Sequence, residues 1–128
     1  MVENSGGGVV TSAEGTRVLR CAADGPVLTS GQAVTDLVGD ALGHRADVVI
    51  VPVERLDPRF FVLSSGVAGE IVQKFVTYGL RLVVLGDIAG HLDASEPLRD
   101  FVREANRGRQ TWFVADPAEL DARWTARG

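Results

Sequence analysis

The chain has 128 residues, the length of one ordinary domain, and it can bury a core without disulfide bonds. Its net charge of -4 and its pI of about 5.1 oppose nonspecific binding to nucleic acid, which requires clustered Lys and Arg. The single cysteine, Cys21, excludes an internal disulfide and a multi-thiolate metal site.

The first residues lack the basic and apolar segments of a signal peptide, and no apolar run approaches the ~20 residues of a membrane-spanning helix. We therefore expect a cytoplasmic protein that has neither membrane nor nucleic-acid partners. Residues 1–8 end in three glycines and are expected to be flexible. Residues 9–128 are expected to form a single α/β domain.

The first part of the domain predicts a hairpin followed by a helix and a strand. The β-branched run 9–12 and the alternating run 16–21 are separated by turn residues, which is typical of an antiparallel hairpin. Apolar residues then recur on one helical face up to Gly43, after Thr29 or Ser30 as the N-cap. The apolar run 46–53 predicts a parallel strand that is buried on both faces.

The second half repeats the alternation of helix and strand. We predict a helix over 65–79, a buried strand over 80–85 and a third helix from Ser95 to Gly108. A last strand at 111–114 is followed by a helix whose start at Asp116 has an Asp cap, then Pro, and Glu three residues later.

The predicted order is therefore ββαβαβαβα, and it indicates an α/β fold with a mainly parallel five-stranded sheet. Helical crossovers between parallel strands are right-handed, so strands two to five should lie side by side in sequence order. The first strand should pair antiparallel at an edge.

A hydroxyl motif opens the second predicted helix, in the stretch Leu63-Ser64-Ser65-Gly66-Val67. With the order of elements, it resembles the STAS fold of anti-sigma-factor antagonists, in which a phosphorylated serine opens the corresponding helix. Ser65 lines up with the phosphorylated position, whereas Leu63 stands where those proteins have an acidic residue. The resemblance implies a sequential βα superhelix and a serine that is a kinase target.

A longer set of motifs resembles the bacterial family named domain of unknown function 4180. The similarity covers roughly residues 15 to 125 and implies a STAS-like fold without an established activity. The stretches that carry it are 60–70, Gln73-Lys74-Phe75, Tyr78, Gly86-Asp87 and 101–106.

Polar side chains gather where the predicted parallel strands end, which is the edge at which open α/β sheets bind ligands. Glu54 and Arg55 follow the third strand and Asp87 follows the fourth. A helix N-terminus offers free N–H groups to an anion. We therefore predict a phosphate-type anion or phosphorylation site that consists of Ser64, Ser65, Gly66 and Arg55.

Each of these residues also has a purely structural interpretation. Ser65 can be the N-cap of its helix, and Asp87 can be a turn residue after a glycine. Glu54 can pair with Arg55. Glu70 lies four residues before Lys74, the spacing of an ion pair on one helix face.

The remaining reactive side chains predict no metal and no cofactor. His44 and His91 have no partner at metal-ligand spacing. Cys21 has no neighbouring base in the sequence that would activate it as a nucleophile.

The third predicted helix is rich in arginine. Arg99, Arg103, Arg107 and Arg109 alternate with acidic residues, so the run is either a solvated helix face or a surface for an acidic partner. In the second case Arg103, Asn106 and Arg107 would contact the partner.

Two functions fit these observations. One is a non-enzymatic regulatory or protein-interaction module, and the other is a small acid/base enzyme that uses Glu54, Glu70 and Asp87. We also expect a homodimer, because several aromatic side chains could form an exposed apolar patch. These are Trp112, Phe113, Trp124, Phe60 and Phe61.

Overall fold

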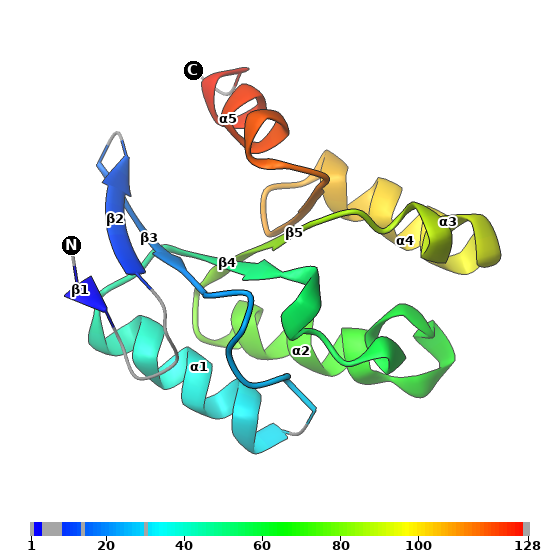
Figure 1. The fold of residues 1–128 in the computed structure, drawn as a ribbon, viewed down its shortest axis with the longest axis horizontal. Helices are drawn as coiled ribbons and strands as arrows, with labels where there is room; N and C mark the ends of the chain where they lie inside the picture. Colours follow the sequence, from blue (N-terminus) through cyan, green and yellow to red (C-terminus); the bar gives the residue numbers. More distant parts are fainter. Residues whose placement is uncertain (1, 4–8, 14, 30, 127–128) are drawn as a thin grey trace.

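The computed structural model describes residues 2–3, 9–13, 15–29 and 31–126. In this part of the chain one sheet carries helices on both faces (Figure 1). The strands are β1 (Val2–Glu3), β2 (Val9–Ala13), β3 (Thr16–Arg20), β4 (Val48–Pro52), β5 (Arg81–Leu85) and β6 (Thr111–Val114). The α-helices are α1 (Gly31–Gly43), α2 (Val67–Thr77), α3 (Ala89–Ala94), α4 (Glu96–Arg107) and α5 (Pro117–Ala126).

The six strands lie in the sheet in sequence order, from β1 at one edge to β6 at the other. The pairs β1–β2 and β2–β3 are antiparallel, whereas β3, β4, β5 and β6 are parallel neighbours. The predicted α/β class, the hairpin and the sequential order of the last four strands are therefore confirmed. The sheet is mixed, however, and it has six strands instead of five, because Val2–Glu3 adds an edge strand that is too short to show a sequence pattern.

Two predictions fall largely on residues whose placement is not described. Of the predicted flexible segment 1–8, only Val2–Glu3 is described, and the rest lies outside the described residues. The same holds for Ser30, one of the two alternative caps of α1.

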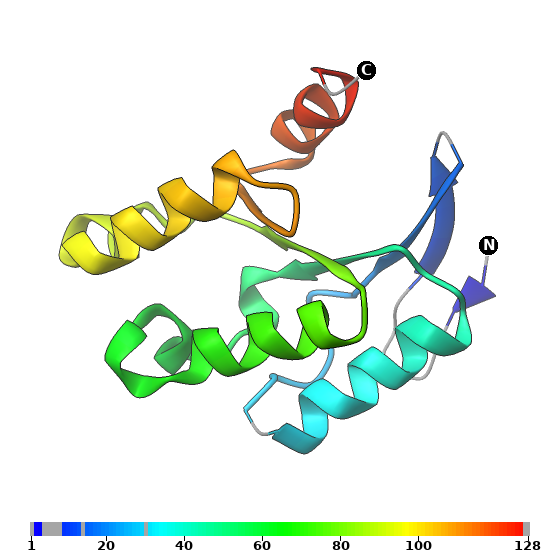
Figure 2. The same ribbon diagram turned by 180° about the vertical axis from the view of Figure 1, so that it is seen from behind.

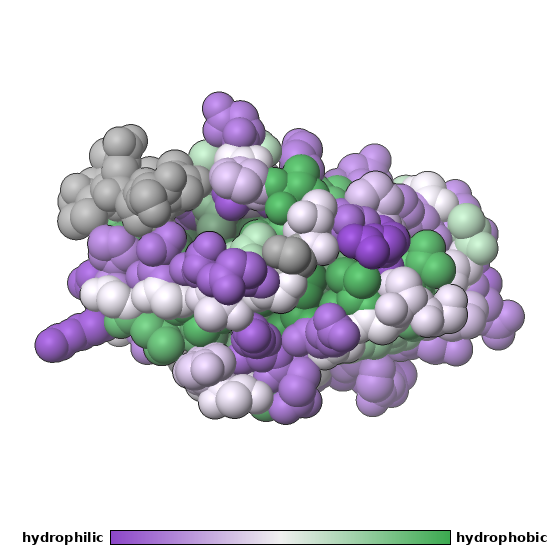
Figure 3. Space-filling model, turned by 90° about the horizontal axis from the view of Figure 1, so that it is seen from below, coloured by the Kyte–Doolittle hydropathy of each residue, from purple (hydrophilic) through white to green (hydrophobic). Residues whose placement is uncertain are grey.

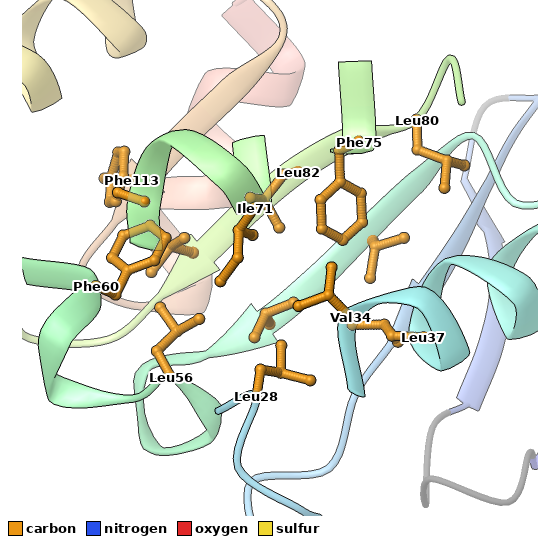
Figure 4. Packing of buried hydrophobic residues seen from close by; sticks show 14 of the residues in the cluster. Leu28, Val34, Leu37, Leu56, Phe60, Ile71, Phe75, Leu80, Leu82 and Phe113 are labelled. Atoms are coloured by element: carbon orange, nitrogen blue, oxygen red, sulfur yellow. The ribbon is translucent and has the colours of Figure 1, made fainter. Parts of the chain in front are cut away.

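Alternate side chains of the parallel strands enter two separate apolar clusters. Val49, Val51, Leu82 and Val84 face the larger cluster beneath α1, α2 and α4 (Figure 4). Their sequence neighbours in the strands face a smaller cluster with Leu120 of α5. Figures 1 and 2 accordingly show α5 on the opposite side of the sheet from α1 and α2.

The expected exposed aromatic patch is wrong. Trp112 and Phe113 are buried because they point to opposite faces of β6 and fill one cluster each. Phe60 and Phe61 are also buried, and the Phe60 ring lies 6.2 Å from that of Phe113. Trp124 is half-buried, with its ring edge-on to Trp112 at 6.3 Å.

The stretch between β4 and α2 contains three 3-10 helices that the sequence did not predict. They are η1 (Val53–Arg55), η2 (Pro58–Phe61) and η3 (Leu63–Ser65). Such short helices leave no periodic pattern of apolar residues. In η2, the Asp57 carboxylate accepts the N–H of Arg59 and caps the helix. The short helix α3 was missed for the same reason.

Gly86 brings the end of β5 close to η1. Its φ is +146°, and a Cβ atom at this position would lie only 2.7 Å from Cγ2 of Val53. Val53 belongs to a packed segment, so neither side can move away without cost. This close approach fixes how the ends of β4 and β5 meet.

We predict that Gly86→Ala lowers the free energy of unfolding by about 2 kcal/mol or more, through steric overlap and backbone strain. Urea unfolding measures this change. Gly39→Ala is the matched control, because a Cβ there meets no atom within 4 Å and Gly39 lies inside α1. The control should gain about 0.5–1 kcal/mol. Equal stability of the two variants would contradict the close approach.

Candidate functional site

The turn that precedes α2 presents both predicted serines to solvent. Ser64 and Ser65 are exposed at the end of η3, and Gly66 follows with a φ of +82°. Gly66 is the N-cap residue of α2, so the interpretation of Ser65 as the cap is wrong in position. The Ser65 hydroxyl nevertheless accepts the N–H of Val67 at 3.2 Å and donates to the carbonyl of Arg59 at 2.6 Å.

Arg59 ties this turn to its surroundings. Its guanidinium donates to both oxygens of Asp57, at 3.1 and 3.0 Å, and to the carbonyl of Thr29 at 3.2 Å. The hydrogen bond from Arg59 lowers the pKa of Asp57 below its ordinary value. The Arg59 side chain is still 60% exposed, so part of a cation faces solvent near Ser65.

Arg55 is not part of this turn, although the sequence analysis predicted it in one anion site with Ser64, Ser65 and Gly66. It is 4% exposed, and its guanidinium donates to the carbonyls of Pro26 and Ala22 in the loop after β3. Its own carbonyl accepts the N–H of Leu28. Arg55 therefore holds the β3–α1 loop against the end of the sheet.

The three predicted catalytic carboxylates are exposed and lie in different places. Asp87 accepts the N–H of Ala89 at 2.9 Å, which is the turn role predicted as its alternative. Glu70 lines the groove between α1 and α2, and Glu54 lines neither of the two cavities described below. The predicted Glu70–Lys74 ion pair is replaced by a bond from Lys74 Nζ to Thr35 of α1, at 2.8 Å.

The larger cavity is an open groove of about 440 Å³ between α1 and α2. Apolar side chains such as Val34, Val67 and Ile71 form its floor. Among the described residues that line it, Glu70 and Lys74 are the charged ones. Figure 3 views the molecule from the side on which α1 and α2 lie and shows apolar surface between hydrophilic side chains. The groove lacks a convergent set of polar groups that would indicate catalysis.

A smaller cavity of about 250 Å³ lies at the carboxyl ends of β5 and β6. Asp87, Asn106 and Glu119 are its polar lining residues, among apolar side chains such as Leu92 and Phe113. Glu119 was missed as a site residue because the sequence presents it as a helix-start residue. It does act there, since its carboxylate accepts the N–H of Ala115 at 3.0 Å.

The residues predicted to bind a partner on α4 have roles within the protein. Asn106 Oδ1 accepts the N–H of Phe113 at 2.8 Å, and Asn106 Nδ2 donates to the carbonyl of Phe113 at 3.2 Å. This side chain thereby occupies polar groups of the edge strand β6, which would otherwise be available to another strand. Arg103 and Arg107 form exposed ion pairs with Asp100 and Glu104 one helical turn earlier.

The environment of Cys21 does not favour a nucleophile. Burial raises the pKa of its thiol from 9.0 to about 11.

His91 stacks on Phe61, with ring centroids 4.2 Å apart. Within residues 2–3, 9–13, 15–29 and 31–126, no three His, Cys, Asp or Glu side chains come together as metal ligands.

Comparison with known protein families gives one match. The model of the family described as Domain of unknown function (DUF4180) matches residues 13–124. The chain belongs to this family. The family region spans the Ser64–Gly66 turn and both cavities. Searches of curated proteins and of solved structures gave no match.

The helices were also compared with the requirements of a membrane span. None of those in the described part of the chain is both long and apolar enough to cross a bilayer.

We predict that Asn106→Ala lowers the free energy of unfolding by about 2 kcal/mol, because it leaves the N–H and carbonyl of Phe113 without their partner. Chemical denaturation checks this value. Arg103→Ala is the control on the same helix and should cost less than about 1 kcal/mol, since it loses only an exposed ion pair. Equal costs for both variants would contradict the structural role of Asn106.

The raised pKa of Cys21 predicts slow alkylation. At pH 8 the folded chain should react with iodoacetamide about 100-fold more slowly than the denatured chain, because two pKa units separate the thiols. The raised pKa also makes the free energy of unfolding depend on pH. The unfolded thiol loses its proton from pH 9 upward while the folded thiol keeps it, so this contribution is lost as the pH rises from 9 towards 11. Cys21→Ala should lack that part of the decline, and an unprotected thiol at pH 8 would refute the assignment.

Proposed function

We propose that this domain is a non-enzymatic regulatory or protein-interaction module of the cytoplasm, with a STAS-like arrangement of its βα units. Its regulated surface would be the turn Ser64–Gly66 at the start of α2, where a phosphate or another small anion changes the binding of a partner protein. The exposure of two adjacent serine hydroxyls on this turn is the observation that carries the proposal.

The surroundings of the turn support a protein-binding surface. Val62 is 55% exposed and stands two residues before Ser64. The partly exposed guanidinium of Arg59 adds a cation next to the apolar side chain. An apolar contact with a polar rim is what partner-binding surfaces provide.

The two serines differ in what a phosphate would do. The Ser65 hydroxyl already has two partners, and phosphorylation would remove its donation to the Arg59 carbonyl. Ser64 makes no side-chain hydrogen bond to any described residue, so a phosphate there leaves the turn intact. A dianion at the start of an α-helix is favoured by the helix dipole. We therefore assign the switch to Ser64 in preference to Ser65.

The placement of the carboxylates also favours binding over catalysis. A general acid or base is usually tuned by burial or by a close partner, and two such groups must converge on one substrate. Glu54, Glu70 and Asp87 are exposed and do not share a cavity. The sequential order of β3, β4, β5 and β6 agrees with the STAS-like order that the resemblance implies.

An acid/base enzyme remains the second candidate because of the smaller cavity. It holds the carboxylates of Asp87 and Glu119 at the carboxyl ends of β5 and β6, where α/β sheets bind ligands. The predicted homodimer is not part of either proposal, since four of the five aromatic side chains on which it rested are buried.

We predict that Ser64→Asp changes the set of proteins that the domain captures from host lysate, whereas the isosteric neutral variant Ser64→Asn does not. The reason is that only the aspartate adds charge where the partner docks. Ser65→Ala serves as the structural control. It should lower the free energy of unfolding by about 1 kcal/mol, through loss of two hydrogen bonds, and leave the captured proteins unchanged.

Peptide mass spectrometry of the protein isolated from its host is the accompanying measurement, and a phosphoryl group on Ser64 would support the switch. If Ser64→Asp and Ser64→Asn capture the same proteins and no phosphoryl group is found, the switch is refuted. The variant Asp87→Asn then tests the second candidate function, the acid/base enzyme.

A further inference from the structure

Arg81 and Arg123 pack against Trp112 near the amino ends of β5 and β6. The main chain of a third arginine, Arg109, is hydrogen-bonded to Arg81. Arg81 begins β5, Arg109 lies just before β6, and Arg123 comes from α5. The amino ends of parallel neighbours meet at one edge, so Arg81 and Arg109 are brought together by strand pairing. Arg123 reaches them because α5 covers the same face of the sheet (Figure 1).

The contacts of the three side chains define an arginine cluster. The Arg81 and Arg123 guanidinium carbons lie 4.6 and 4.3 Å from the centre of the Trp112 ring, within the range of cation–π interaction. Arg81 Nε donates to the main-chain carbonyl of Arg109. Arg123 Nη2 donates to the carbonyl of Asn106 at 2.6 Å. Two of the three guanidiniums are thereby held in place. Arg109 is exposed, and its charge acts on Arg81.

This positive charge has no acidic partner among the described side chains. The ion pairs found there belong to Arg59, Arg103 and Arg107, and none involves the arginine cluster. Burial, together with the charges of Arg109 and Arg123, lowers the pKa of Arg81, as expected for crowded cations. The Nε of Arg123 is buried and donates to no described acceptor. Like charges thus stand close together with hydrogen-bond donors to spare, in a chain whose net charge is -4.

We propose that the arginine cluster of Arg81, Arg109 and Arg123 binds a compact phosphate-type anion. Guanidinium groups match the oxygen geometry of phosphate with paired, charge-assisted hydrogen bonds. The anion would relieve the mutual repulsion of the three cations. The site is separate from the Ser64–Gly66 turn, and its failure would leave the proposed interaction module untouched.

The ligand is a single phosphoryl group and not a nucleic acid. A polyanion requires an extended row of cations, whereas the arginine cluster is one compact group in an acidic chain. The Trp112 ring already contacts two guanidinium groups and the edge of Trp124. The anion would therefore be bound by the guanidinium donors. A group of small size and double charge suits a compact group of cations.

Tryptophan fluorescence reports directly on this site. The chain has two tryptophans, and their rings lie 6.3 Å apart within the arginine cluster. Titration with inorganic phosphate at constant ionic strength should give a saturable change in emission, with isothermal titration calorimetry as a second measurement. Sodium acetate, a singly charged anion, is the matched control and should give no saturable change.

Arg109→Gln should weaken phosphate binding about tenfold or more, because it removes the charged donor of an exposed side chain. Arg103→Gln makes the same change of charge on the outer face of α4 and should leave the affinity unaltered. Arg109→Lys, which keeps the charge and loses the planar fork, should fall between the two. Thermal melts should show all three variants folded.

The proposal is overturned if phosphate produces no saturable signal in either measurement, or if acetate reproduces the signal. It is equally overturned if Arg103→Gln weakens binding as much as Arg109→Gln, because net charge alone would then explain the effect.

Discussion

Two interior parallel strands, β4 and β5, send alternate side chains into two apolar clusters, and each strand is buried on both faces. Helices must therefore cover both sides of the sheet: α1, α2 and α4 on one side and α5 on the other. The strand ends are the places left for polar chemistry. At one of them Gly86 permits the close contact with Val53, which sets the path of the chain beyond β5.

Burial on both faces also explains why several polar residues serve the fold. Main-chain N–H and carbonyl groups near a covered sheet need partners, and side chains supply them. Arg55 does so for the loop after β3, and Asn106 does so for the edge strand β6. Ser65 does the same where η3 meets α2. Residues whose type suggested a functional site in the sequence thus bind main-chain groups of the fold.

The charges divide between the two ends of the parallel strands. At the carboxyl ends of β4 and β5 lie the exposed carboxylates of Glu54 and Asp87. At the amino ends, Arg81 and Arg123 pack against one tryptophan, and the charge of Arg109 acts on Arg81. The chain is acidic overall, but the local field at the arginine cluster differs in sign from the net charge.

The sequence by itself determined the α/β class, the sequential parallel strands and the helix starts at Ser95 and Asp116, because these depend on local periodicity and on caps within a few residues. The family followed from its motifs. Only the tertiary structure decided that Asn106 holds β6 and that Arg81 and Arg123 share Trp112. These contacts join residues that are far apart in the sequence, and strand pairing and helix packing bring them together.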